Sequence, residues 1–213
     1  MNRTEHWNRV YSQKADTDLS WYQPEATLSC SIIQQLGLQK DAAIIDIGGG
    51  GPSAFPVELT QLGYTHLTVL DISAEGLQRC RQRLGNQADA VTWVEADITR
   101  FAPTEPYDVW HDRAVFHFLT EARDQLAYRT ALYQGVKAGG YAMIAAFAPD
   151  GPASCSGLNV MRWEPQALAE LLGDEFVLTA LSRENHQTPW GKPQAFTYCL
   201  FRRIKHSQPL TST

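Results

Sequence analysis

The 213-residue sequence lacks the features that mark several large classes of protein. Basic residues are fewer than acidic ones, 18 against 23, and the net charge of −5 is unlike the basic footprint of a nucleic-acid binder. No apolar run approaches the roughly 18 residues needed to span a bilayer. The opening MNRTEHWNRVY contains no apolar signal segment. These absences predict a cytoplasmic protein that binds neither membranes nor nucleic acid.

Cysteine is also scarce and scattered. Cys30, Cys80, Cys155 and Cys199 form no C-x-x-C pair, which excludes a zinc ribbon and a dithiol motif. No three His or Cys residues have the spacing of metal ligands. We therefore expect reduced thiols and no metal site. Cys155, in the loop PASCSG, is expected to be exposed and incidental to function.

The sequence does contain short apolar runs that alternate with helical patterns. Runs typical of buried strands cover residues 42–47, 66–72, 91–98, 107–112 and 141–148. Helical patterns cover residues 24–37, 53–63, 74–85 and 121–140, the third capped by Ser73 and the last ending in a Gly-Gly turn. The alternation predicts an α/β fold: a doubly wound, mostly parallel sheet with helices on both faces.

The pattern changes after residue 148. A loop rich in Gly, Pro and Ser is followed by a short helix at 164–173 and by β-like runs at 175–185 and 195–203. No helix fits in the connection HQTPWGKPQ, so the last two strands are expected to form an antiparallel hairpin that completes a seven-stranded sheet. We expect one domain over residues 1–205 and a disordered tail at 206–213.

Acidic residues follow the first four predicted strands. Asp46 precedes four glycines, Gly48–Gly51, and the later strands end at Asp71, Asp97 and Asp112. In open parallel sheets, ligands bind at the carboxyl ends of the strands. A glycine turn lets a ligand approach backbone N–H groups, and an acid after the second strand can accept hydrogen bonds from ribose hydroxyls. The pattern predicts a ligand that carries an adenosine-like nucleoside.

The glycines alone fit either a dinucleotide such as NAD or S-adenosylmethionine (SAM). Read from Gly49, the turn matches the dinucleotide pattern G-x-G-x-x-A. Three features favour SAM. The carboxylate of Asp46 suits a cationic amine and sulfonium better than a pyrophosphate. The pair Asp97 and Ile98 suits adenine, and a C-terminal antiparallel hairpin is unusual in a dinucleotide domain.

From about residue 7 to residue 203 the sequence resembles the class I, Rossmann-type SAM-dependent methyltransferases. DIGGGG corresponds to their D-x-G-x-G turn, VLDIS to their ribose-binding acid and EADI to their adenine-binding loop. YDVWHDRAVFHFL resembles their fourth motif, and VKAGGYAMIAAF resembles their turn into strand five, with Ala138 in place of the usual proline. The resemblance implies SAM as cofactor. The residues it implies are Asp46, Gly48, Gly49 and Gly50 for the methionine end, Asp71 and Ile72 for the ribose, Asp97 and Ile98 for adenine, and Asp112 near the sulfonium.

The N-terminal segment EHWNRVYSQKADTDLSWYQP is similar to the opening of two kinds of small methyltransferase. One kind modifies protein lysines, and the other modifies small molecules that carry a thiol or another chalcogen. In both kinds this segment covers the cofactor. The resemblance implies that residues 1–24 form a lid in which Trp21, Tyr22 and Gln23 close over SAM. The alternative is that these aromatic side chains only pack the N-terminus onto the sheet.

The methyl acceptor is less well defined by the sequence. Candidate substrate contacts are Arg113, His117, His186 and Trp190, and candidate bases are His111, His117 and His186. A hydroxyl or carbon acceptor generally needs a base, whereas a thiolate or a neutral amine does not. We expect a small-molecule acceptor, because no broad acidic groove is evident that would guide a basic protein tail. The alternatives are a protein lysine methyltransferase, a non-catalytic SAM-binding protein and an NAD-binding oxidoreductase.

Overall fold

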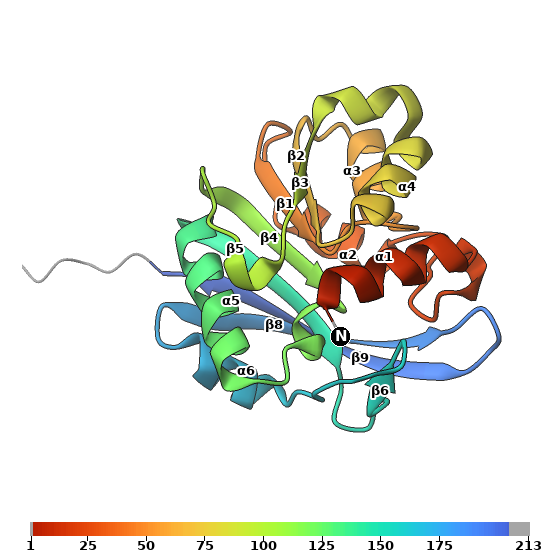
Figure 1. Ribbon diagram of the computed structural model, residues 1–213. Coiled ribbons are helices and arrows are strands. Elements are labelled where there is room, and N and C mark those ends of the chain that lie inside the picture. Colours follow the sequence, from red (N-terminus) through yellow and green to blue (C-terminus); the bar gives the residue numbers. More distant parts are fainter. Residues whose placement is uncertain (1, 205–213) are drawn as a thin grey trace, which may run out of the picture.

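Seven strands form one sheet in the computed structural model, which describes residues 2–204 (Figure 1). The strands are β1 (Ala43–Ile47), β2 (His66–Asp71), β3 (Val91–Glu95), β4 (Tyr107–Arg113), β5 (Val136–Phe147), β8 (Phe176–Gln187) and β9 (Pro193–Arg203). Their order is β3-β2-β1-β4-β5-β9-β8. The first five strands pair in parallel, and β9 is antiparallel to both β5 and β8. The fold class predicted from the sequence, including the C-terminal hairpin, is confirmed.

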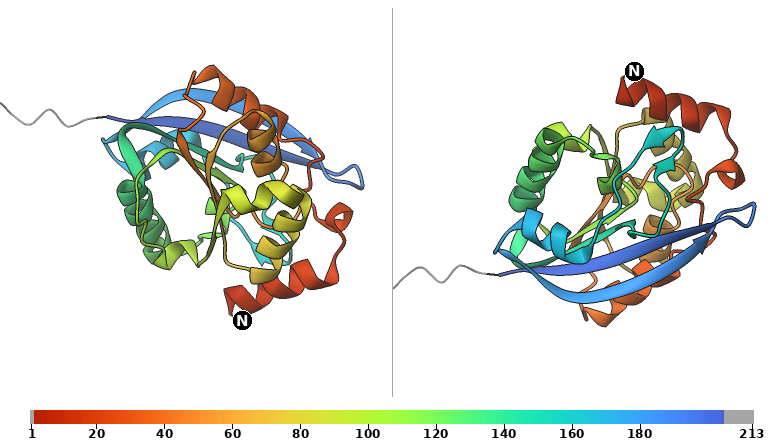
Figure 2. Two further views of the ribbon diagram at one scale, coloured as in Figure 1. Left: turned by 90° about the horizontal axis from the view of Figure 1, so that it is seen from above. Right: turned by 90° about the horizontal axis from the view of Figure 1, so that it is seen from below.

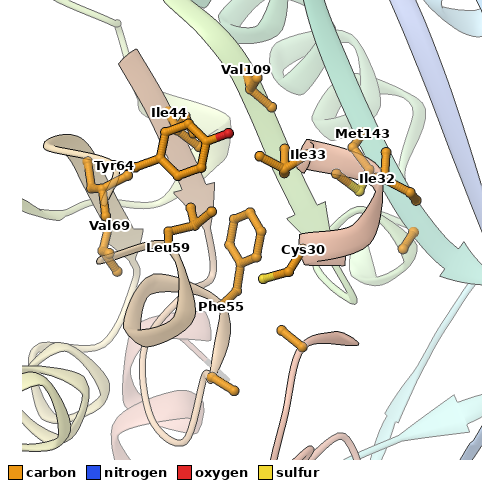
Figure 3. Close-up of a cluster of buried hydrophobic side chains, with 14 of the residues drawn as sticks. Cys30, Ile32, Ile33, Ile44, Phe55, Leu59, Tyr64, Val69, Val109 and Met143 are labelled. Atoms are coloured by element: carbon orange, nitrogen blue, oxygen red, sulfur yellow. The ribbon is translucent and has the colours of Figure 1, made fainter. Parts of the chain in front are cut away.

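Helices cover both faces of this sheet (Figure 2). They are α1 (Arg3–Gln13), α2 (Thr27–Gln35), α3 (Phe55–Gln61), α4 (Ala74–Leu84), α5 (Ala122–Gly135) and α6 (Pro165–Leu172). On one face, Cys30 and Ile33 of α2 and Phe55 and Leu59 of α3 belong to one buried apolar cluster (Figure 3). Side chains of α5 and α6 form the cluster on the other face. The two-sided burial explains why the strand sequences are continuously apolar.

Local sequence signals account for several of these boundaries. All five residues of β1 are buried, as its unbroken apolar run requires. The Ser73 hydroxyl accepts a hydrogen bond from Gly76 N–H at 3.0 Å and so caps α4, as predicted. Gly85 ends the same helix at φ +56°.

Three boundaries differ from the predictions. The helix predicted over 121–140 ends at residue 135, because buried Val136 pairs with Tyr107 and already begins β5. His186, predicted in a loop, lies in β8, since β8 and β9 remain paired up to Gln187 and Pro193. The loop after residue 148 contains a small hairpin of β6 (Ser154–Cys155) and β7 (Leu158–Asn159). The predicted tail at 206–213 lies outside the described residues.

Helix α1 was not predicted, although Asn2 caps its first turn. The helix packs against α4 and lies beside the carboxyl ends of the parallel strands (Figure 1). The sheet order reverses at this edge, because β1 has β2 on one side and β4 on the other. Such a switch in strand order is where an open α/β sheet binds its ligands.

Candidate functional site

Two adjoining hollows lie at the carboxyl ends of the parallel strands. The first hollow is lined by residues of α1, of the segment that follows α1 and of the carboxyl ends of β1 to β4. The lining residues include Arg3, Trp7, Tyr11, Trp21, Gly48, Asp71, Ile72, Asp97, Ile98, Arg113, Val115, Phe118, Leu119 and Cys155. The second is lined by Trp21, Gln23, Ser29, Asp46, Gly48, Gly50, Ser53, Phe55, His111 and Arg113, among others. Trp21, Gly48 and Arg113 border both hollows. The two hollows are therefore two parts of one crevice.

The glycine turn between β1 and α3 reaches this crevice through Gly48 and Gly50. Gly48 and Gly51 adopt φ angles of +70° and +65°, which strongly favour glycine. A Cβ atom at Gly48 would overlap the Val115 side chain, and one at Gly51 would overlap the Tyr11 ring. At Gly49 and Gly50 a Cβ would meet the carboxylates of Asp46 and Asp71, respectively. The four consecutive glycines are thus explained by four different side chains that press against the turn.

Asp71 ends β2 in the wall of the first hollow. Its carboxylate accepts hydrogen bonds from Ser73 N–H at 2.9 Å, Gly50 N–H at 3.0 Å and the Tyr11 hydroxyl at 3.5 Å. Burial raises the pKa of Asp71 to about 6, although the backbone hydrogen bonds act in the opposite direction. A buried carboxylate in this position can accept hydrogen bonds from a diol, as a ribose would present.

Asp97 and Ile98 border the same hollow. The Asp97 carboxylate accepts hydrogen bonds from Thr99 N–H at 2.9 Å and from the Thr99 hydroxyl at 2.8 Å, and it lies 3.7 Å from the Arg3 guanidinium. Ile98 lines the hollow together with Val115 and Leu119. This apolar wall with a carboxylate beside it suits a planar ring that carries an amino group.

A chain of three polar side chains lines the second hollow. Asp46 and His111 are direct neighbours on β1 and β4, and His111 Nδ1 lies 2.7 Å from Asp46 Oδ1. His111 Nε2 lies 2.9 Å from the Ser29 hydroxyl of α2. All three residues are at most 5% exposed, and the His111 ring stacks on Phe55 at 3.8 Å. Ser29 was not predicted as a site residue, since a serine within an amphipathic helix carries no sequence signal for it.

Aromatic residues of the N-terminal segment cover the first hollow. Trp7 packs edge-on against Trp21 and Phe118, with ring centroids 5.7 Å and 5.0 Å apart. Tyr11 lies beside Trp21, and both border the hollow. Tyr22 packs against the cluster of Val10, Tyr11 and Leu19 and is not among the residues that border either hollow. The structure therefore brings Trp21 to the crevice, together with Trp7 and Tyr11 one helical turn apart on α1.

Arg113 connects this covering segment to the sheet. Its guanidinium donates to the Glu184 carboxylate at 3.0 Å, to the Tyr198 hydroxyl at 2.9 Å and to the carbonyl of Trp21 at 3.3 Å. Gln23 also donates to Glu184, at 2.6 Å. We call Arg113, Glu184, Tyr198 and Gln23 the clamp. The clamp fixes residues 21–23 between β4 and the β8–β9 hairpin.

Asp112 lies behind the crevice and is not among the residues that border it. Its fully buried carboxylate accepts hydrogen bonds from the Tyr128 hydroxyl at 2.8 Å and from Val115 N–H at 3.0 Å. Burial raises the pKa of Asp112 to about 6. Asp112 thereby holds the turn in which Ala114 adopts a φ of +71°, a strained value for a residue with a side chain.

Gly49 borders neither hollow, and three other predicted residues also lie away from both. His117 is completely buried against Phe118 and Phe147, and burial lowers its pKa to about 3. Neither of its ring nitrogens has a hydrogen-bond partner among residues 2–204. His186 is held by the carbonyl of Ser20 at 2.7 Å, and Trp190 is 58% exposed in the hairpin turn.

The expectation that Cys155 is exposed is wrong. The residue is 6% exposed and borders the first hollow, because the β6–β7 hairpin turns inward against Ser20. Burial raises the pKa of its thiol.

Among residues 2–204, no helix is long and apolar enough to cross a membrane, and no cluster of three or more His, Cys, Asp or Glu side chains could hold a metal ion.

Comparison with known proteins gives matches to methyltransferases. Residues 44–140 match a family model described as a methyltransferase domain. A trans-aconitate 2-methyltransferase of Rhizobium etli is 32% identical over 109 residues, which are 51% of this chain and 40% of that protein. The matched part of the chain thus spans less than half the length of this curated relative.

Solved structures extend the likeness to nearly the whole fold. The N-methyltransferase NodS of Bradyrhizobium japonicum, in complex with S-adenosylhomocysteine (SAH), has a TM-score of 0.69 at 16% identity, and the match covers 96% of this chain and all of that one. A 1,6-didemethyltoxoflavin-N1-methyltransferase of Burkholderia thailandensis has a TM-score of 0.65 at 18% identity, with 95% and 84% covered. At these identities the likeness shows the fold.

Proposed function

We propose that this chain is a SAM-dependent methyltransferase of the class I, Rossmann type that methylates a small molecule; the match to a methyltransferase domain and the likeness of the fold to NodS support this. One observation carries the proposal: two buried carboxylates, Asp71 and Asp46, border adjoining hollows that meet at Gly48. SAM has a ribose diol near its middle and a cationic amine at one end. One carboxylate in each hollow suits these two groups, with Asp71 for the diol and Asp46 for the amine.

In this proposal the first hollow takes the adenosine part of SAM. Asp71 accepts hydrogen bonds from the ribose hydroxyls, Asp97 faces the amino group of adenine, and Ile98 packs on its ring. The second hollow takes the amino-acid part, with Asp46 opposite the amine. A pyrophosphate would be repelled by a carboxylate at Asp46, so the same residues favour SAM over a dinucleotide.

When bound, SAM supplies a methyl group on a positively charged sulfur. The protein's own part is to hold the cofactor, to align the acceptor for in-line displacement and to exclude water. Alignment alone can lower the barrier by about 7–11 kcal/mol in favourable cases. Residues 1–24 act as the lid, with Trp7, Tyr11 and Trp21 as the side chains that close the crevice.

None of the three candidate histidines is placed to act as a base. This favours an acceptor that reacts without one. Both nitrogens of His111 are engaged by Asp46 and Ser29, and His186 is bound to the carbonyl of Ser20. His117 has a pKa of about 3 and lies outside both hollows. A carboxylate, a thiolate or a neutral amine is nucleophilic without such help.

A small-molecule acceptor is supported by the enclosure of the crevice beneath aromatic side chains. The names of two similar proteins, a trans-aconitate 2-methyltransferase and a 1,6-didemethyltoxoflavin-N1-methyltransferase, also refer to small molecules. The first of these substrates is an acid, which agrees with an acceptor that reacts without a base.

The test uses methyl-labelled SAM, the purified protein and a whole lysate separated by molecular size after incubation. Label in the small-molecule fraction, lost in the Asp71→Asn variant, is the expected result. Label in a discrete protein band would instead identify a protein methyltransferase, such as a lysine methyltransferase. No transfer to either fraction, despite SAM binding, would indicate a non-catalytic SAM-binding protein.

A further inference from the structure

We propose that His111 is a positioning residue for the amino-acid end of the cofactor, acting through Asp46. The proposal rests on the proposed function and extends it to a residue that does not itself hold the cofactor. In this account His111 fixes one oxygen of the Asp46 carboxylate. The other oxygen is thereby directed to the cationic amine of SAM.

The geometry gives His111 two partners and little freedom. Asp46 and His111 are registered side by side on neighbouring parallel strands, so their side chains emerge on the same face of the sheet. Nδ1 of the ring lies 2.7 Å from Asp46 Oδ1, and Nε2 lies 2.9 Å from the Ser29 hydroxyl. The stacking of the ring on Phe55 restricts it further. An imidazole held at both nitrogens and on one face keeps a single orientation.

The surrounding hydrogen bonds indicate which group donates to which. An ionised carboxylate can only accept, so Nδ1 carries the proton and donates to Asp46. The Ser29 hydroxyl lies 2.9 Å from Nε2 and also hydrogen-bonds to Tyr198. The second ring nitrogen is therefore engaged by a hydroxyl that is itself held in place.

The contact with His111 occupies only one oxygen of the Asp46 carboxylate, Oδ1. The remaining oxygen, Asp46 Oδ2, has the Ser53 hydroxyl as its neighbour at 3.4 Å, which is a long hydrogen bond. This oxygen is the one assigned to the ligand.

The arrangement also distinguishes His111 from a general base. A base must have a nitrogen that can reach the acceptor. Both nitrogens of His111 face protein groups, and the residue is 2% exposed. Its contribution is therefore expected in cofactor binding, through the orientation of Asp46.

The experiment compares two ligands by isothermal titration calorimetry. SAH carries the amino-acid end, whereas 5′-methylthioadenosine has the same adenosine and sulfur without it. His111→Leu removes the donor with little change in size, and His111→Asn keeps an amide N–H near the position of Nδ1. Ser29→Ala releases Nε2 and provides a milder second variant.

We expect His111→Leu to bind SAH at least roughly tenfold more weakly, since a hydrogen bond to a charged group is lost. Its affinity for 5′-methylthioadenosine should stay within about twofold of wild type, and His111→Asn should recover most of the SAH affinity. Ser29→Ala should weaken SAH alone, by a smaller factor.

If His111→Leu lowers the affinity for both ligands equally, the role of His111 is merely structural and the proposal is overturned. Unchanged SAH affinity in His111→Leu would also overturn it. Failure of His111→Asn to recover affinity would also contradict it. If His111→Leu does not fold, the Asn and Ala variants decide by the same comparison. Wild-type protein that binds neither ligand would instead refute the proposed function.

Discussion

The carboxylate of Asp71 is buried by the protein's own fold. Its pKa is about 6, compared with 3.8 for a free aspartate, because burial outweighs the two backbone hydrogen bonds it accepts. A raised pKa means that the folded state holds this proton more tightly than the unfolded state. The resulting stability is fully present below about pH 4 and is lost as the pH rises through about 6.

Asp71→Asn cannot ionise, so it should escape this loss. The free energy of unfolding of the variant, measured relative to wild type by urea denaturation, should rise by up to about 3 kcal/mol between pH 4 and pH 6. Asp112 has the same direction of shift but is present in both proteins, so it cancels. The exposed Asp41→Asn is the control. A difference that stays constant over this pH range would contradict the burial of Asp71.

Gly48 has a φ angle in the left-handed region, and the side chain of Val115 packs against it. Gly48→Ala should destabilise the protein by more than the ~1–2 kcal/mol of backbone strain, because its Cβ would also displace Val115. Gly63→Ala is the matched control, since Gly63 has a φ of +85° and no atom near its Cβ position. Equal melting temperatures for the two variants would contradict the crowding at Gly48.

At the scale of elements, the clamp joins β4, β8 and β9 to residues 21–23. The Arg113 and Glu184 side chains are only 9% and 17% exposed. Glu184→Ala would leave a buried guanidinium without its counter-ion, which should cost about 3 kcal/mol in urea unfolding. Arg183→Ala is the neighbouring control: its ion pair with Asp150 is half exposed and should contribute less than about 1 kcal/mol. Similar losses for both variants would show that the clamp is not a buried ion pair.

The lid itself is tested at Trp21, which borders both hollows. Trp21→Ala should weaken SAH binding about tenfold or more, because a large aromatic surface no longer covers the ligand. Leu126→Ala, an exposed apolar residue of α5, is the control. A variant that melts at a lower temperature but binds SAH normally would show that the aromatic residues only pack the N-terminus onto the sheet.

The sequence predicts elements well where one local signal dominates. Continuous apolar runs locate β1 and β2, and Ser73 locates the start of α4. The boundary between α5 and β5 is mispredicted, because VKAGG has no strong preference and only pairing with β4 decides it. Helix α1 is missed because its sequence is mostly polar and because two of its few apolar residues, Trp7 and Tyr11, border the crevice.

At the scale of the whole molecule, the sequence predicts the edge of the sheet at which the site lies. Acids at the ends of successive strands converge there once the strands are parallel, and this accounts for Asp46, Asp71 and Asp97. The contacts made by His111, Ser29, Arg113 and Cys155 depend on which distant elements meet, so they require the structure. Asp112 shares the sequence pattern of the other acids, yet its carboxylate is used by the turn after β4 and by Tyr128.

The proposed function requires that the crevice bind SAM. The most direct measurement is calorimetric titration of the purified wild-type protein with SAH, and with NAD in parallel. One SAH molecule should bind per chain, more weakly at pH 5 than at pH 7, because a protonated Asp71 is a poorer hydrogen-bond acceptor, and NAD should give no heat of binding. Binding of NAD without SAH would contradict the account and identify the crevice as a dinucleotide site.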